Sequence, residues 1–201
     1  MMPTLNDDKK LELLNDHYKD TFVYLKETLR LRDRLFVFIL VTITLLLFQL
    51  YSPSEAGTTI GAFIAKQLDV QNAVSIAFVG SVIWFALLAF VMRYFQTVIF
   101  IERQYKYIHN LENQLSVHYD HKAFTREGKS YLKNYPMFSD WAYYLYTLIF
   151  PLLLIAVVVG KMVNEYVFAS GISFLLVLNS VIALGIVIST VLYLRMVHFG
   201  K

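Results

Sequence analysis

The sequence lacks cysteine altogether and carries few charged residues for its length. Of its 201 residues, only 16% are Asp, Glu, Lys or Arg, whereas 57% are hydrophobic. A soluble domain of ordinary composition has about 25% charged residues. Without cysteine, the chain can form no disulfide, no thiolate nucleophile and no cysteine-ligated zinc or iron–sulfur site. These absences favour a membrane protein over an extracellular disulfide-rich domain or a thiol enzyme.

A catalytic or cofactor-binding motif is also missing. Residues 128–130 read Gly-Lys-Ser, as at the end of a phosphate-binding P-loop, but Ala123 stands where that motif requires a glycine. His118, Asp120 and His121 offer three metal ligands in one loop without a fourth, which favours a solvated or interfacial cluster over a metal site. We therefore expect no enzymatic activity, no metal and no cofactor. The net charge of +3 does not indicate nucleic-acid binding.

What the sequence has instead is four long apolar stretches. A helix that spans a bilayer needs about 20 apolar residues. Four segments meet this requirement, namely residues 35–51, 73–92, 141–160 and 172–194. We predict an all-α integral membrane four-helix bundle that forms a single membrane domain over residues 1–201.

The positive charges predict the orientation of this bundle. Residues 1–34 and residues 93–140 each carry seven Lys or Arg, and the C-terminus adds Arg195 and Lys201. The two remaining loops carry one each, Lys66 and Lys161. Because cytoplasmic loops are enriched in Lys and Arg, both termini and residues 93–140 are expected in the cytoplasm. The predicted location is the bacterial inner membrane.

Two of the predicted spans are expected to continue as helices into the cytoplasm. Before the first span, apolar residues recur at steps of three and four within residues 1–34, and after the second span the same pattern runs from Ile101 to Leu115. Such a pattern is typical of a helix with one apolar face. The two faces are expected to bury against each other, against another subunit or against a partner. This cytoplasmic amphipathic helix and the helix and loop of residues 93–140 would form a helical stalk.

Basic and aromatic residues of the stalk and loop are the candidate contacts for lipid headgroups or a partner. This group consists of Arg103, Lys106, Arg126, Lys129, Lys133 and Tyr135. A mixture of Lys, Arg and aromatic residues suits the anionic inner surface of a membrane.

The spans have no ionisable residue in their middle, so their mild polar groups are the only candidates there. Gln49, Asn179 and Ser180 are expected either to hydrogen-bond a neighbouring helix or to line a pore. Pro151 is expected to bend the third span, with the Thr147 hydroxyl satisfying the carbonyl that proline leaves free. Residues 161–171 are expected to form only a turn, whereas residues 52–72 are expected to hold a short amphipathic helix with Thr58 or Thr59 as its cap.

The arrangement of four spans, cytoplasmic ends and a charged helical loop from Glu102 to Asp140 resembles the small four-helix membrane subunits of bacterial anti-phage defence systems, such as the Kiwa membrane component. The resemblance is one of architecture and carries over no functional residue. It implies an inner-membrane sensor or effector paired with a cytosolic protein. From the residues alone, a homo-oligomeric scaffold, sensor or signalling subunit with a cytosolic partner is one hypothesis, and a small homo-oligomeric channel or pore-forming effector is the alternative.

Overall fold

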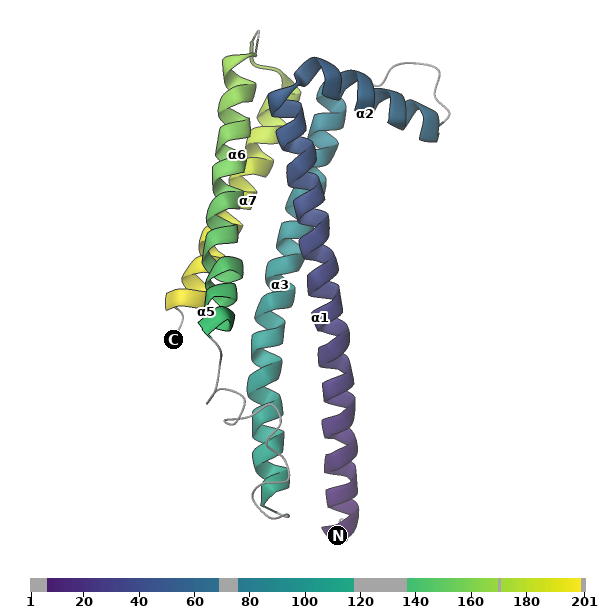
Figure 1. Cartoon of the computed structure of the whole chain (residues 1–201), viewed down its shortest axis with the longest axis vertical. Helices are drawn as coiled ribbons and strands as arrows, with labels where there is room; N and C mark the ends of the chain where they lie inside the picture. The colour runs from purple at the N-terminus through teal and green to yellow at the C-terminus, as the bar shows by residue number, and fades with distance from the viewer. Residues whose placement is uncertain (1–6, 69–75, 118–136, 170, 200–201) are drawn as a thin grey trace. The chain divides into compact units, whose positions relative to one another are not determined.

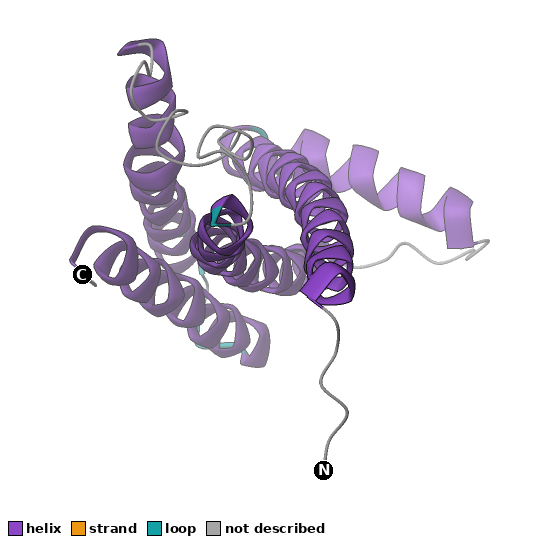
Figure 2. Cartoon of the chain, turned by 90° about the horizontal axis from the view of Figure 1, so that it is seen from below, coloured by secondary structure: helices purple, strands orange, loops and turns teal. Residues whose placement is uncertain are grey.

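The computed structural model describes residues 7–68, 76–117, 137–169 and 171–199. These residues form helices and short turns, with no strand in the described ranges (Figure 2). The elements are α1 (Asp7–Tyr51), α2 (Pro53–Leu68), α3 (Ile76–Ser116), α5 (Met137–Tyr144), the π-helix η1 (Leu145–Ile149), α6 (Phe150–Val167) and α7 (Phe174–Phe199). The predicted all-α fold is confirmed.

Four helical stretches are long and apolar enough to cross a membrane. They are Asp8–Tyr51, Ala77–Ser116, Trp141–Val167 and Phe174–Phe199. Each contains one of the four predicted spans in whole or large part, so the chain has the helices of a multi-pass membrane protein.

The chain divides into two compact units, and α1 and α3 contribute to both. The helix-pair unit comprises Met1–Arg34 and Gln96–Trp141, and the bundle unit comprises Leu35–Phe95 and Ala142–Lys201. The division of α1 falls at the predicted start of the first span.

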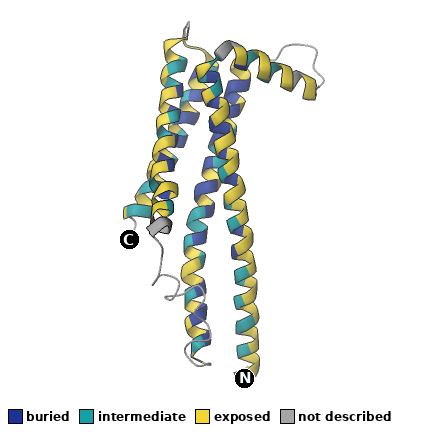
Figure 3. Cartoon of the chain, in the orientation of Figure 1, coloured by how far each residue is buried: buried dark blue, intermediate teal, exposed yellow. Residues whose placement is uncertain are grey.

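Burial along α1 and α3 follows a seven-residue repeat. Positions at alternating steps of three and four are all buried or half-buried (Figure 3), from Leu11 to Gln49 in α1 and from Gly80 to Leu115 in α3. In α1 these positions are Leu11, Leu14, Tyr18, Thr21, Leu25, Thr28, Arg32, Leu35, Ile39, Thr42, Leu46 and Gln49. In α3 they are Gly80, Ile83, Leu87, Phe90, Tyr94, Thr97, Ile101, Gln104, Ile108, Leu111 and Leu115. A strict heptad repeat is the pattern of a coiled coil.

In the helix-pair unit, α1 packs antiparallel to α3. Leu25, Ile101 and Ile108 form a buried cluster, against which Tyr18, Phe22 and Leu29 pack. Of the three alternatives left open by the sequence, the structure shows the first, with the two apolar faces packed against each other within one chain. Tyr24 contacts Phe100, and Tyr18 contacts Glu112 further along α3, so the two helices run in opposite directions.

In the bundle unit, α3 packs against both α1 and α7. Gln49 and Phe38 of α1 lie against Gly80 and Phe90 of α3, again in antiparallel order. Three contacts join α3 to α7 in parallel order, namely Leu88 with Gly185, Met92 with Ser189, and Phe95 stacked on Tyr193 at 4.1 Å between ring centroids. Since α6 and α7 are antiparallel, successive long helices of the bundle reverse direction (Figure 1).

Two loop predictions need correction. The segment expected to be a mere turn is helical as far as Val167, because apolar residues continue on α6 beyond Gly160. The predicted helix in residues 52–72 is present as α2, but Thr58 and Thr59 lie inside it and cap nothing at its start. Pro53 begins α2, as suits a residue without a backbone N–H.

Pro151 follows a single turn of π-helix. Because proline has no backbone N–H, the carbonyl of Thr147 loses its usual donor four residues later. That carbonyl lies 3.3 Å from Nε2 of His198 on α7, while the Thr147 hydroxyl donates to the carbonyl of Tyr143 at 2.7 Å. The expectation that Thr147 itself satisfies the freed carbonyl is therefore wrong, since His198 takes that role from another helix.

Candidate functional site

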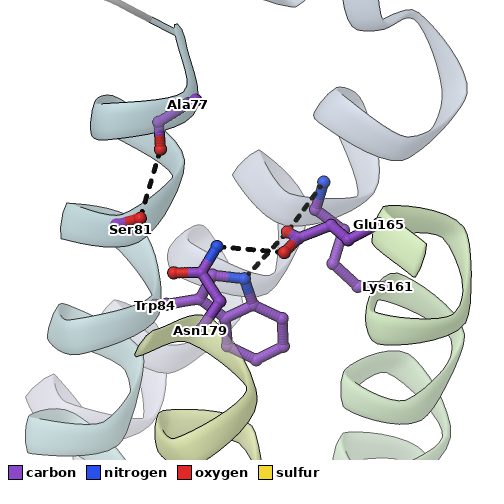
Figure 4. A network of polar contacts seen from close by, with 6 residues as sticks. All are labelled: Ala77, Ser81, Trp84, Lys161, Glu165 and Asn179. Carbon is purple, nitrogen blue, oxygen red and sulfur yellow. Dashed lines mark hydrogen bonds and ion pairs between the residues drawn. The ribbon is translucent and has the colours of Figure 1, made fainter. Parts of the chain in front are cut away.

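The carboxylate of Glu165 is the centre of a polar network inside the bundle unit (Figure 4). Its Oε1 accepts a hydrogen bond from Trp84 Nε1 at 3.0 Å and lies 3.4 Å from Lys161 Nζ. Its Oε2 accepts a hydrogen bond from Asn179 Nδ2 at 2.9 Å. One carboxylate thus ties α6 to α3 and α7.

The members of this network are largely withdrawn from solvent. Trp84 is fully buried, and Asn179 and Lys161 are 5% and 7% exposed. Charged side chains are costly to bury unless they are paired and hydrogen-bonded. In a helix that could cross a membrane, such a group marks a candidate functional site. The Lys161–Glu165 ion pair lies near one end of α6, within a helix that could cross a membrane, and Glu165 is also hydrogen-bonded. It is therefore a candidate functional site.

Two amide atoms near this network lack a partner among the described residues. The charge of Glu165 fixes the orientation of Asn179, because its amide nitrogen must face the carboxylate, and its Oδ1 is then left without a donor. On α1, Gln49 is 6% exposed and its Nε2 has no acceptor. Buried amide atoms of this kind are commonly satisfied by water or a ligand.

The structure places the predicted packing or pore residues at this end of the bundle. Gln49 lies against Gly80 and Asn179 binds Glu165, whereas the half-buried Ser180 donates to the carbonyl of Leu176 and meets the hydroxyl of Tyr166 at 2.8 Å. All three therefore make contacts between or within helices of one chain.

The predicted partner or lipid contacts are only partly described. Arg103 and Lys106 are exposed on α3 in the helix-pair unit. Arg126, Lys129, Lys133 and Tyr135 lie outside the described residues.

Sequence reasoning missed Glu165, Lys161 and Trp84 as members of a site. Assigning residues 161–171 to a turn hid the spacing of four between Lys161 and Glu165, which places both side chains on one helical face. The continuing apolar residues Met162, Val163 and Val167 were the available signal for a longer helix. The link to Trp84, on another helix, had no signal in the sequence.

The helix-pair unit has a second set of polar contacts. His17 Nε2 lies 2.7 Å from the hydroxyl of Tyr107, and the two rings meet edge to face. Tyr18 donates its hydroxyl hydrogen to Glu112 Oε1 at 3.2 Å. Glu112 is 2% exposed, and its Oε2 has no hydrogen-bond partner in the described part of the chain.

Comparisons of the chain with protein-family models, with curated proteins and with solved structures gave no match.

Proposed function

We propose that this protein is an inner-membrane scaffold, sensor or signalling subunit that couples the membrane to a cytosolic partner. In this proposal the bundle unit resides in the bilayer and the helix-pair unit meets the partner on the cytoplasmic side. A place in anti-phage defence is the biological setting that the architectural resemblance suggests.

The observation that carries the proposal is the continuity of α1 and α3. Each is one unbroken helix that contributes to both units, and each keeps a single heptad repeat of buried positions over its length. A helix that keeps its repeat cannot turn at one end without displacing its buried positions at the other. A change of packing in the bundle would therefore reach the helix pair through two continuous helices, and a relay between the two units requires such a connection.

Polar residues in the repeat would make such a change feasible. Thr21, Thr28 and Arg32 in α1, with Thr97 and Gln104 in α3, occupy positions that are apolar in a strongly fixed coiled coil. Fewer apolar contacts lower the free-energy cost of an alternative packing. We propose two packings of the helix pair, one of which the partner prefers.

Native mass spectrometry of the protein purified from its own host in mild detergent tests this function. It should show a homo-oligomer that retains a soluble protein in fixed stoichiometry. Replacing Leu25 and Ile108 with Asp should release that protein while the membrane oligomer persists, because these residues form the buried cluster of the helix pair. The control is Leu13→Asp, at a position of α1 that is 55% exposed. Retention of the soluble protein by the Leu25/Ile108 variant would contradict the proposal.

A homo-oligomeric pore is the second candidate, and the unpartnered amide atoms of Gln49 and Asn179 favour it. Water in a lumen would supply the missing donor and acceptor. Purified protein in liposomes should then conduct ions, and Asn179→Leu should reduce the conductance. If the liposomes show no conductance and the native complex retains a soluble partner, the scaffold or sensor function is favoured over the pore.

A further inference from the structure

Glu112 is a buried carboxylate whose hydrogen bonds are incomplete. It is 2% exposed, one oxygen accepts only the neutral phenol of Tyr18, and the other has no donor among the described residues. Two ion pairs of α1 residues in this unit, Lys19 with Asp16 and Arg32 with Asp33, do not include it. A buried carboxylate without a cation is costly, so a positively charged donor would stabilise Glu112 beyond what its contacts with the described residues provide.

The other unsatisfied atom in the helix pair is also an acceptor. Gln104 Oε1, two helical turns before Glu112 on α3, is buried without a donor in the described residues. Both vacant atoms call for N–H donors. A hydrogen-bond donor, rather than an anion or an acceptor, is therefore the chemistry that this face would take.

The surroundings of Glu112 favour a guanidinium group among possible donors. Tyr18, which binds Glu112, stacks on Phe22 with ring centroids 6.4 Å apart and planes at 16°. Phe22 already accepts a cation, since Lys26 Nζ lies 4.8 Å from the centre of its ring. A guanidinium is planar, stacks on aromatic rings and pairs with carboxylates, whereas an ammonium is a more strongly hydrated point charge.

We propose that Glu112, with Tyr18 and Phe22, is the binding site for an arginine side chain that the cytosolic partner inserts into the helix pair. The proposal rests on the proposed function only for the source of the arginine. Because Glu112 is buried, arginine can reach it only when the packing around it shifts. Binding at this site would therefore stabilise the shifted packing and couple partner binding to the bundle.

Binding of a small probe to the purified full-length protein tests this site without the partner. The probe is N-acetylarginine amide, and the neutral analogue N-acetylcitrulline amide has nearly the same shape. Titration followed by intrinsic fluorescence should show saturable binding of the arginine probe only. Glu112→Gln should weaken binding by at least about tenfold, because a hydrogen bond to a charged group contributes about 1.5–3 kcal/mol.

Two further variants distinguish a specific loss of probe binding at this site from general effects of charge or folding. Glu102→Gln, at a half-buried position of the same helix, should bind the probe like the natural protein. Phe22→Leu removes an aromatic ring of the site and keeps the carboxylate, so it should weaken binding of the arginine probe even if Glu112→Gln fails to fold. Equal affinity for the two probes, or equal affinity of Glu112→Gln and Glu102→Gln, would overturn the proposal. Probe binding without a soluble partner in the native complex would instead contradict the proposed function alone.

Discussion

Glu165 makes polar contacts with three other side chains of the bundle unit. Its two oxygens face an indole N–H, an amide N–H and an ammonium group from three positions, Trp84, Asn179 and Lys161. A side chain of such connectivity acts as a clamp between helices. Because hydrophobic burial gives little driving force between helices within lipid, polar contacts of this kind contribute specificity there.

Replacement of Glu165 by Ala should destabilise the protein by about 3–5 kcal/mol, since it leaves a buried ammonium and two buried N–H groups without an acceptor. Reversible unfolding in mixed micelles measures this change. Glu55→Ala, at an exposed position on α2, is the control. The double replacement Lys161→Met with Glu165→Gln should recover most of the lost stability, because the uncompensated charge is gone. Equal stability of Glu165→Ala and Glu55→Ala would show that the network is not a clamp.

At the residue scale, composition singled out some of the buried polar residues but not how they are paired. Asn179 and Gln49 could be selected because they are rare polar groups within apolar runs. Glu165 could not, since its importance arises from Trp84 and Asn179, which lie 81 and 14 residues away along the chain. Pairings between helices depend on rotation about each helix axis, which one sequence does not fix.

At the scale of the elements, the third long helix, Trp141–Val167, departs from regular α-helical geometry next to Pro151. The π-helix Leu145–Ile149 precedes the proline, and His198 of α7 lies within hydrogen-bonding distance of the carbonyl that the proline leaves free. Single π-helical turns and prolines both bend helices. The carbonyl that the proline leaves free is thus satisfied by a contact from a neighbouring helix.

His198→Ala should lower the free energy of unfolding by about 1–3 kcal/mol, because it leaves a buried polar group without its partner. Pro151→Ala restores a backbone N–H that can donate to the Thr147 carbonyl. In the Pro151→Ala variant, His198→Ala should therefore lower the free energy of unfolding only slightly. A double-mutant cycle of unfolding free energies measures the difference, and two additive mutations would refute the role assigned to His198.

The helices themselves were predictable because apolar length and periodicity dictate them. The continuation of α1 and α3 beyond their predicted spans followed from apolar steps of three and four, and the burial of Leu25 and Ile108 agrees with it. The end of α6 was predicted too early because Gly160 and Lys161 read as a boundary. In the structure a buried ion pair compensates for that charge, so the helix continues.

For the whole molecule, the absence of cysteine permits a direct test of the predicted orientation. Single cysteines at Lys9 and Gln67, both exposed, can be labelled with a membrane-impermeant maleimide in intact spheroplasts. Gln67→Cys should react at once, and Lys9→Cys only after the membrane is permeabilised, because positive charge retains the N-terminal segment in the cytoplasm. Labelling of Lys9→Cys in intact spheroplasts would reverse the orientation and place the helix pair outside.

The relay that we propose for α1 and α3, from the bundle unit to the helix-pair unit, can be measured directly. Spin labels on Asp20→Cys and Arg103→Cys, two exposed positions of the helix pair, report the separation of the two helices by double electron–electron resonance. The protein would carry Glu165→Gln, which weakens the bundle network, or Glu55→Gln as the control.

If the relay operates, Glu165→Gln should shift the distance distribution between the two labels, whereas Glu55→Gln should leave it unchanged. An identical distribution in the natural background and in Glu165→Gln, with the bundle still folded, would contradict the relay.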